Sequence, residues 1–228
     1  MEIRPIAHIR TDFGEKFGIP RQSGLVKNIG KIVFEEEFRD SEAIRGIEGF
    51  SHLWLIFDFS KNHREGWSPT VRPPRLGGNT RMGVFATRSP FRPNNLGLSS
   101  VKLISEEHDD TFGSVLIVEG ADLLDNTPIY DIKPYIKFTD CHEDAVSGFS
   151  EDVFDHSLKV GYEENLLSVF SESERETLIG CLSQDPRPSY QDDGREYGML
   201  FAGYNIKFTV NGDILTITAV TRNTDRNQ

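Results

Sequence analysis

The sequence predicts a mainly β fold that ends in a smaller, mixed α+β part. Up to about residue 137, short runs of Ile, Val, Phe and Leu alternate with Gly, Pro, Asn and Asp. Many short strands separated by turn residues are typical of a small barrel or a sandwich. Beyond residue 137 the apolar residues recur at helical spacing before two final strand-like runs. These patterns predict two domains, 1–137 and 138–228.

The first part contains seven predicted strands and one short helix. The strands are expected at 3–9, 30–34, 52–59, 82–87, 98–106, 114–119 and 127–135. The helix is expected at 41–45, with Ser41 as its N-cap.

The second part contains a helical region at 163–183 and two strands at 197–210 and 213–220. Ser171 with Glu174, and Ser173 with Glu176, each match a capping box, so one helix is expected to end and another to begin there. Prolines in 185–190 end the helix, because proline cannot continue it. The dipeptide Asn-Gly at 211–212 predicts a hairpin between the final strands.

Charge is distributed unevenly along the chain. The net charge is −11, and residues 140–196 alone hold 15 acidic against 4 basic residues. In contrast, residues 61–95 hold 7 basic residues and one acidic residue. A polyanion therefore has a locally basic surface to bind, whereas the acidic segment is typical of a solvated helical face.

The absence of several known motifs argues against several classes of protein. No G-x-G-x-x-G motif opens a helix after a strand, which argues against a Rossmann site, and P-loop, H-E-x-x-H and G-x-S-x-G motifs are absent. The six histidines and two cysteines lack metal-ligand spacing, so no metal is expected. The longest apolar run is too short to span a bilayer and no secretory leader is evident, so we expect a soluble, cytoplasmic protein.

Four polar loops border the predicted strands and are the candidate binding elements. They are 20–24, 60–67, 87–99 with 71–78 just upstream, and 122–128. Each is either an ordinary turn or a rigid support for a polar ligand. In the third loop, prolines stiffen the chain around Arg88 and Arg92, which lowers the entropy that these side chains lose on binding.

The residues in these loops resemble the TsaA-like (TrmO) family. MGVFATRSPFRPNNLGLS carries the resemblance, with VRPPRLGG upstream and DLLDNTPIYDIKPYI downstream. PRQSGLVKN, RGIEGFSHLWLIF, QDPRPSYQ and YGMLFAGYNIKF extend it over nearly the whole chain except about 140–180. The resemblance implies a small, non-Rossmann β-barrel that binds S-adenosylmethionine, a C-terminal domain and a homodimer. It also implies methylation of N6 of threonylcarbamoyladenosine at position 37 of tRNA.

Matching the family motifs residue by residue implies a set of donor-binding positions. They are Pro20, Arg21, Gln22, Ser60, Lys61, Arg88, Leu98, Asp122, Leu123, Leu124 and Asp125. Arg88 is expected to pair with the carboxylate of the donor, and Asp122 or Asp125 to accept hydrogen bonds from its ribose or ammonium group. Two departures stand out: Ser60 replaces a frequent histidine, with His63 close by, and Asn95 replaces a frequent proline.

The acceptor side is assigned with less support from the motifs. Arg92 is expected to contact the threonyl carboxylate or a phosphate of the anticodon loop, and Phe91 either stacks on a base or packs inside the barrel. Further tRNA contacts are expected from Arg72, Arg75, Arg187 and Tyr190. The sequence identifies no general base; Tyr130 and Asp131 are weak catalytic candidates.

Two other functions are compatible with the sequence. The acidic segment at 140–196 would repel extended RNA, which favours a methyltransferase of the same fold that acts on another nucleoside or a small metabolite. The serine at position 60 leaves open a non-catalytic module that binds the donor or RNA.

Overall fold

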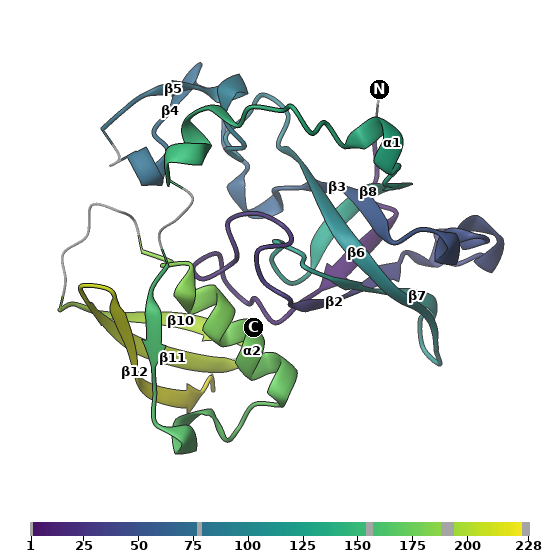
Figure 1. The fold of residues 1–228 in the computed structure, drawn as a ribbon. Helices are drawn as coiled ribbons and strands as arrows, with labels where there is room; N and C mark the ends of the chain where they lie inside the picture. Colours follow the sequence, from purple (N-terminus) through teal and green to yellow (C-terminus); the bar gives the residue numbers. More distant parts are fainter. Residues whose placement is uncertain (1, 77–78, 154–156, 188–193, 225–228) are drawn as a thin grey trace.

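The computed structural model describes the chain except residues 1, 77–78, 154–156, 188–193 and 225–228. It consists of two sheets, each with its own hydrophobic core, and one longer helix (Figure 1). A small two-stranded sheet, β4 (Thr70–Val71) with β5 (Met82–Gly83), lies beside the first. The mainly β prediction is thereby confirmed.

Six antiparallel strands form the first sheet and pair in a closed ring, which we call the ring sheet. In ring order they are β1 (Ala7–Arg10), β2 (Ile29–Phe34), β7 (Gly113–Glu119), β6 (Leu96–Asp109), β3 (His52–Asp58) and β8 (Thr127–Pro134). β1 closes the ring because it pairs with both β2 and β8.

Alternation of side chains along these strands produces the interior of the ring sheet. In β3, Leu53, Leu55 and Phe57 are buried, whereas the residues between them are more exposed. Since successive side chains of a strand point to opposite faces, this alternation directs apolar groups into the ring. Ile9, Ile32 and these β3 residues belong to one core.

The second sheet, which we call the C-terminal sheet, is packed against a helix. It runs β10 (Glu196–Phe201), β11 (Tyr204–Asn211), β12 (Ile214–Arg222) and β9 (Lys159–Gly161). α2 (Glu172–Ser183) buries Leu178 and Leu182 in the same core as Phe208 and Leu215. A short α-helix, α1 (Lys137–Asp140), follows β8. Within the described residues, no helix has the length and apolarity to cross a membrane.

The loop between β1 and β2 joins the two cores. Phe13 and Val26 are buried in the core of the C-terminal sheet, although both come from the N-terminal part of the chain. Phe13 forms a β-bridge with Phe201, and the hydroxyl of Thr177 on α2 donates to the Lys27 carbonyl at 3.2 Å. The loop between Phe13 and Val26 is therefore held by the C-terminal sheet as well as by strands β1 and β2 on either side of it.

Most predicted elements are present, with shifted bounds. The segment predicted as one strand at 197–210 is a hairpin, because Ala202 and Gly203 have φ of 47° and 79° and turn the chain between β10 and β11. Alanine is not a usual turn residue at positive φ, so this turn gave no sequence signal. The region 82–87 is a strand only at β5 and continues as a 3₁₀ turn, and β9 was not predicted.

The structure corrects one predicted helix cap and shows which of two possible capping boxes forms. The short helix at Ser41–Ile44 is a 3₁₀ helix capped by Asp40, whose side chain accepts from the Glu42 amide, so the Ser41 cap was wrong. Of the two capping boxes, the structure contains that of Ser171 with Glu174. Ser173 lies inside α2.

The capping box yields a prediction with a matched control. Ser171→Ala removes the hydroxyl that accepts from the Glu174 amide and should lower the free energy of unfolding by about 1 kcal/mol. Ser173→Ala replaces an exposed serine inside the helix and should raise it by a few tenths of a kcal/mol, because Ala favours helix more than Ser. Urea unfolding measures both. Equal effects of the two substitutions would contradict the assignment of the cap.

Candidate functional site

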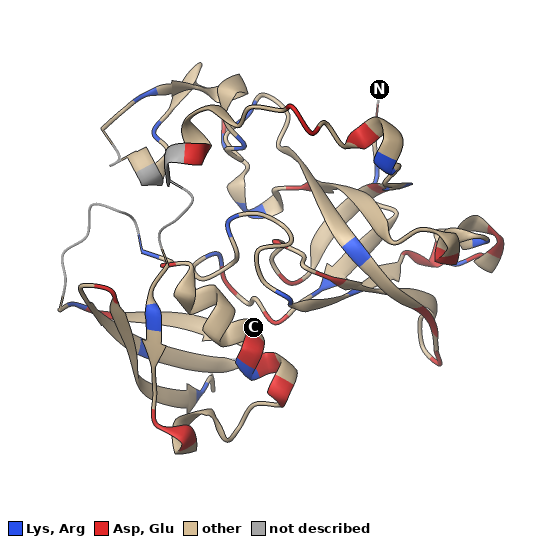
Figure 2. Cartoon of the chain, in the orientation of Figure 1, with Lys and Arg blue, Asp and Glu red and all other residues tan. Residues whose placement is uncertain are grey.

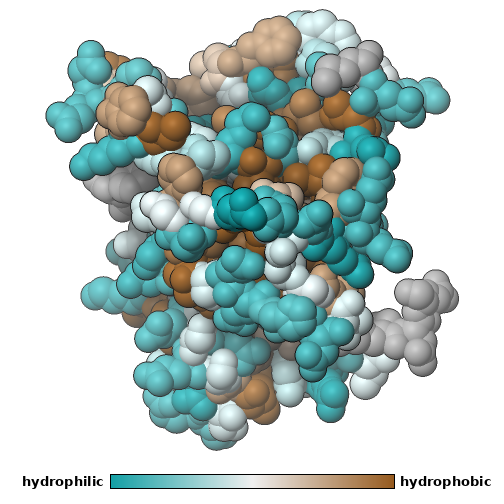
Figure 3. Space-filling model, turned by 90° about the vertical axis from the view of Figure 1, so that its right-hand side faces the viewer, coloured by the Kyte–Doolittle hydropathy of each residue, from teal (hydrophilic) through white to brown (hydrophobic). Residues whose placement is uncertain are grey.

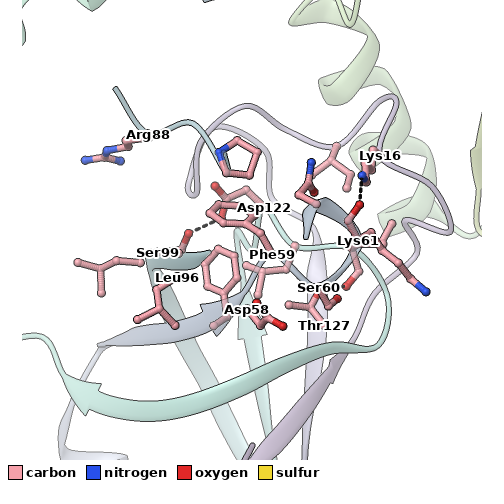
Figure 4. Close-up of a pocket in the computed structure, with 18 of the residues that line it drawn as sticks. Lys16, Asp58, Phe59, Ser60, Lys61, Arg88, Leu96, Ser99, Asp122 and Thr127 are labelled. Carbon is pink, nitrogen blue, oxygen red and sulfur yellow. Dashed lines mark hydrogen bonds between the residues drawn. The ribbon is translucent and has the colours of Figure 1, made fainter. Parts of the chain in front are cut away.

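A pocket of about 580 Å³ opens at one end of the ring sheet. Its wall is built from the loop between β1 and β2, the end of β3, the loop before β6, the start of β6 and the loop before β8 (Figure 4). Its size falls within the range of pockets that hold small molecules and cofactors. Every predicted donor position except Asp125 lines it: Pro20, Arg21, Gln22, Ser60, Lys61, Arg88, Leu98, Asp122, Leu123 and Leu124.

Asp122 is a half-buried carboxylate in the pocket wall. The Ser99 hydroxyl donates to its Oδ1 at 2.6 Å, and the two side chains point at each other in Figure 4. Burial raises the pKa of Asp122 above its ordinary value of 3.8, although the Ser99 hydrogen bond and the Arg88 charge oppose the shift. The folded protein therefore holds a desolvated carboxylate whose charge a cationic ligand group would stabilise.

Arg88 faces the same pocket and is held by a second predicted residue. Its Nη1 donates to Gln22 Oε1, so the loop before β6 and the loop after β1 meet at this hydrogen bond. Gln22 in turn donates to the Arg21 carbonyl at 2.6 Å. The guanidinium is thus oriented by a neutral partner, which leaves its charge for an anionic group.

The apolar part of the pocket depends on a glycine. A Cβ built on Gly97 would lie 2.2 Å from Cζ of Phe57, so only glycine lets this ring lie against β6. Gly97 pairs with Phe57 across β6 and β3, and Leu96 and Leu98 flank it with exposed side chains. Leu96 and Leu98, which also line the pocket, thus give it exposed apolar side chains that suit the face of a purine ring.

One wall of the pocket is tied to the chain after α2. Arg21 Nη2 donates to the Asp185 carbonyl and, at 3.4 Å, to that of Arg187. The Asp185 carboxylate binds the Arg187 guanidinium through two hydrogen bonds of 2.9 and 3.1 Å, and both residues are buried. This burial favours a structural role for Arg187 and weighs against the predicted tRNA contact. Tyr190 lies outside the described residues.

The end of β3 contributes a buried carboxylate that sequence reasoning missed. Asp58 is 7% exposed and lines the pocket. Its Oδ1 lies at hydrogen-bond distance, 2.7 Å, from Nε2 of His63. Burial, with the neighbouring Asp58 carboxylate, raises the pKa of Tyr130 above 10.0. Among the described residues Ser60 lines the pocket and His63 does not, so His63 does not replace the missing histidine in the wall.

The stiff loop before β6 is fixed by its own backbone carbonyls. Arg92 Nη1 donates to the Thr87 carbonyl at 2.7 Å and to that of Val84 at 3.3 Å. Asn95 Nδ2 donates to the Pro90 carbonyl at 2.7 Å, and the Asn95 carbonyl accepts from the Phe59 amide at 2.8 Å. These two bonds hold the loop closed where many family members have proline.

Other predicted residues lie away from the pocket. Asp125 binds Arg10 Nε at 2.9 Å and does not line the pocket, and Asp131 forms an ion pair with Lys133 at 2.9 Å. Arg72 is exposed, and the side chain of Arg75 lies outside the described part of the structure. Donor binding by Asp125 and catalysis by Asp131 therefore gain no support from the geometry.

The pocket is basic although the chain is acidic. Five basic side chains line it against two acidic ones: Lys16, Arg21, Lys61, Arg88 and Arg92, with Asp58 and Asp122. Acidic residues instead gather elsewhere, for example at the start of α2 (Figure 2), where Glu172 and Glu174 occupy the first turn. Such a charge distribution favours an anionic ligand group at the pocket and agrees with a solvated role for the acidic segment.

The pocket residues that sequence reasoning missed fall into two kinds. Asp58 interrupts an apolar run, LWLIFDF, and a charge in such a run is a signal that could have been used. Lys16, Phe57 and Ser99 carry no comparable signal. Lys16 reaches the site because its Nζ donates to the Lys61 carbonyl at 2.5 Å (Figure 4), a contact that depends on how the loops meet.

The raised pKa of Asp122 predicts a pH-dependent stability difference. The folded state binds the proton of Asp122 more tightly than the unfolded state, so stability falls as pH rises from 3.8 through the raised folded pKa. Asp122→Asn should therefore raise Tm at neutral pH, and the gain should shrink as the pH approaches 3.8. Thermal unfolding across this pH range measures it. Asp125→Asn, which breaks the ion pair with Arg10, should give no gain; a Tm for Asp122→Asn that is no higher than wild type at neutral pH would contradict the prediction.

Comparison with known proteins identifies the family of this chain. Residues 8–141 match the family model of the tRNA-methyltransferase O N-terminal domain, and residues 155–223 match that of the TrmO C-terminal domain. A tRNA (adenine(37)-N6)-methyltransferase of Escherichia coli K12 is 40% identical over 220 residues, which cover 92% of this chain and 93% of that protein. The same enzyme of Eikenella corrodens is 46% identical over 174 residues, covering 75% and 97%.

Further relatives agree in cofactor and in structure. A Pseudomonas aeruginosa protein that is named as an S-adenosylmethionine-dependent methyltransferase is 40% identical over 207 residues, covering 86% of this chain and 87% of that protein. A crystal structure of TrmO from P. aeruginosa superimposes with a TM-score of 0.79 at 32% identity and covers 97% of both chains. With family models that match most of its length, the chain belongs to the TrmO family of tRNA methyltransferases.

Proposed function

We propose that this protein transfers a methyl group from S-adenosylmethionine to N6 of threonylcarbamoyladenosine at position 37 of tRNA. The observation that carries the proposal is a basic pocket lined by every donor position of the family motif except Asp125. The relatives of E. coli and Eikenella corrodens, named tRNA (adenine(37)-N6)-methyltransferases, support the acceptor and its position.

The pocket has groups that suit each part of the donor. Arg88 would bind the donor carboxylate, because a guanidinium fork matches a carboxylate in shape and charge. Asp122 would accept hydrogen bonds from the ribose or ammonium group, which offsets the desolvation that raises its pKa. Leu98 with Phe57 would pack on the adenine. When bound, the donor supplies an electrophilic methyl group on its sulfonium.

Methyl transfer needs the acceptor nitrogen in line with that methyl group and a route for its proton. Positioning of reacting groups contributes much of the rate in such displacements. The acceptor nitrogen lies between a purine and a carbonyl, so nearby cations such as Arg92 would favour its deprotonated form. Tyr130 remains a catalytic candidate through its contact with Asp58, whereas Asp131 is engaged by Lys133.

We extend the proposal to the organisation of the protein. Residues 1–137 would form the TsaA-like β-barrel domain that binds the donor, and residues 138–228 a C-terminal α+β domain. The protein would act on tRNA in the cytoplasm as a homodimer. Apolar side chains exposed on the upper half of the face in Figure 3 are of the kind that association of two copies would cover. Arg72, Arg75 and Phe91 would contact the RNA, with Arg72 exposed as such a role requires.

A direct assay tests the function. Incubation with S-adenosylmethionine and tRNA that carries threonylcarbamoyladenosine should add one methyl group to that nucleoside, detected by mass spectrometry of the digested RNA. The same tRNA transcribed without modification is the control and should gain none. Methylation of a free nucleoside or small metabolite in preference to the tRNA would contradict the proposal, as would donor binding without transfer to any modified tRNA.

The donor site has its own test. Arg88→Ala should weaken binding of S-adenosylmethionine about tenfold to a hundredfold, because it removes a charge-assisted bidentate partner. Isothermal calorimetry measures the change. Arg45→Ala, an exposed arginine that pairs with Glu42 outside the pocket, is the matched control and should leave donor affinity unchanged. Equal donor affinity in Arg88→Ala and wild type would remove Arg88 from the site.

A further inference from the structure

A second, smaller pocket of about 210 Å³ adjoins the first. Arg64, Trp67, Phe91, Arg92 and Asn95 line it together with Gly66 and Pro93. Arg92 lines both pockets, so the two share one wall and one guanidinium. The two pockets therefore meet at Arg92, where one ligand could contact both.

The second pocket is cationic. Arg64 and Arg92 are its charged residues, and no acidic side chain is among those that line it. Arg92 donates only to the neutral carbonyls of Val84 and Thr87 in the hydrogen bonds given above. Within the described ranges, neither arginine forms an ion pair with a carboxylate. Two guanidinium charges thus meet at a cavity without a compensating anion.

Aromatic rings orient both guanidinium groups. Cζ of Arg64 lies 4.0 Å from the centroid of Phe91, and Cζ of Arg92 lies 5.8 Å from that of Phe85. Trp67 packs beside Phe85 with 6.1 Å between ring centroids. Contact with a ring face restrains a guanidinium but leaves the N–H groups in the plane of the guanidinium available to an oxyanion. The pocket is therefore arranged in advance for a planar anion such as a carboxylate.

We infer that Arg64 and Arg92 bind the threonyl carboxylate of the acceptor and so select the modified nucleoside. The inference rests on the proposed function. In threonylcarbamoyladenosine the carboxylate is only a few bonds from N6, so with the acceptor nitrogen at the first pocket this carboxylate would lie near Arg92, which both pockets share. Unmodified adenosine has no group for the two charges, and its binding would leave them unpaired. A site built to pair a polar group rejects an analogue that lacks it.

The test compares two synthetic anticodon stem-loops. One carries threonylcarbamoyladenosine at position 37, and the other carries its threoninamide, which keeps the shape but removes the negative charge. The ratio of kcat/KM for the acid to that for the amide reports on carboxylate recognition alone. In wild type we expect a ratio of about tenfold to a hundredfold, the range for a charge-assisted contact.

Variants assign this ratio to the two arginines. Arg64→Gln, an exposed position, and Arg92→Gln should each lower the ratio towards one, whereas Arg45→Gln should leave the ratio at its wild-type value. Donor affinity and Tm of each variant check that the first pocket is intact. Since Arg92 also braces its loop, Arg64→Gln decides the matter if Arg92→Gln is unstable.

The outcomes separate this inference from the function it rests on. Transfer to both stem-loops at equal rates in wild type would overturn the carboxylate site but leave the methyltransferase activity standing. An equal fall in kcat/KM on both stem-loops in Arg64→Gln would assign the arginine to an RNA phosphate and would also overturn it. No transfer to either stem-loop, with donor bound, would remove both the function and the inference.

Discussion

The burial of Phe13 and Val26 in the core of the C-terminal sheet is the constraint on which the site depends. Phe13 and Val26 anchor the two ends of the loop between them in that core, and Arg21 between them is held by the Asp185 carbonyl. The pocket wall therefore has one side on the ring sheet and the other on a loop that a different sheet holds in place. The C-terminal part is required for the geometry of the pocket, although the described residues that line the pocket all come from the N-terminal part.

The site combines charges that the fold keeps apart from one another. Asp122 is half-buried and bonded to Ser99, whereas Arg88 is held by the neutral Gln22 rather than by a carboxylate. The two side chains thus do not neutralise each other in a short ion pair, and each charge remains available to a ligand. Burial raises the pKa of Asp122, and the Ser99 hydrogen bond and the Arg88 charge offset only part of that rise.

The sequence predicted individual strands and helices better than it predicted the pairing of strands and the contacts between loops. Alternation along β3 and β2 and the Ser171 capping box are local signals, and they identified their elements. Closure of the ring by β1 depends on pairings between distant strands, which no local pattern encodes. Most donor positions that the family motif predicted line one pocket. Asp125 does not, because it forms an ion pair with Arg10, which is far away in sequence. Lys16 was missed for the same reason, because the contact with the Lys61 carbonyl joins two loops.

The shared loop also has a consequence for how the protein is made. Residues 13–26 leave the ribosome early, whereas β10–β12, which bury Phe13, are synthesised last. Since chains emerge N-terminus first, the ring sheet can pair while this loop still has an uncovered apolar side. The pocket can form only when the final strands arrive, so an incomplete chain that already holds the whole ring sheet cannot acquire the finished site. Assembly of the pocket therefore has to wait until synthesis of the chain is nearly complete.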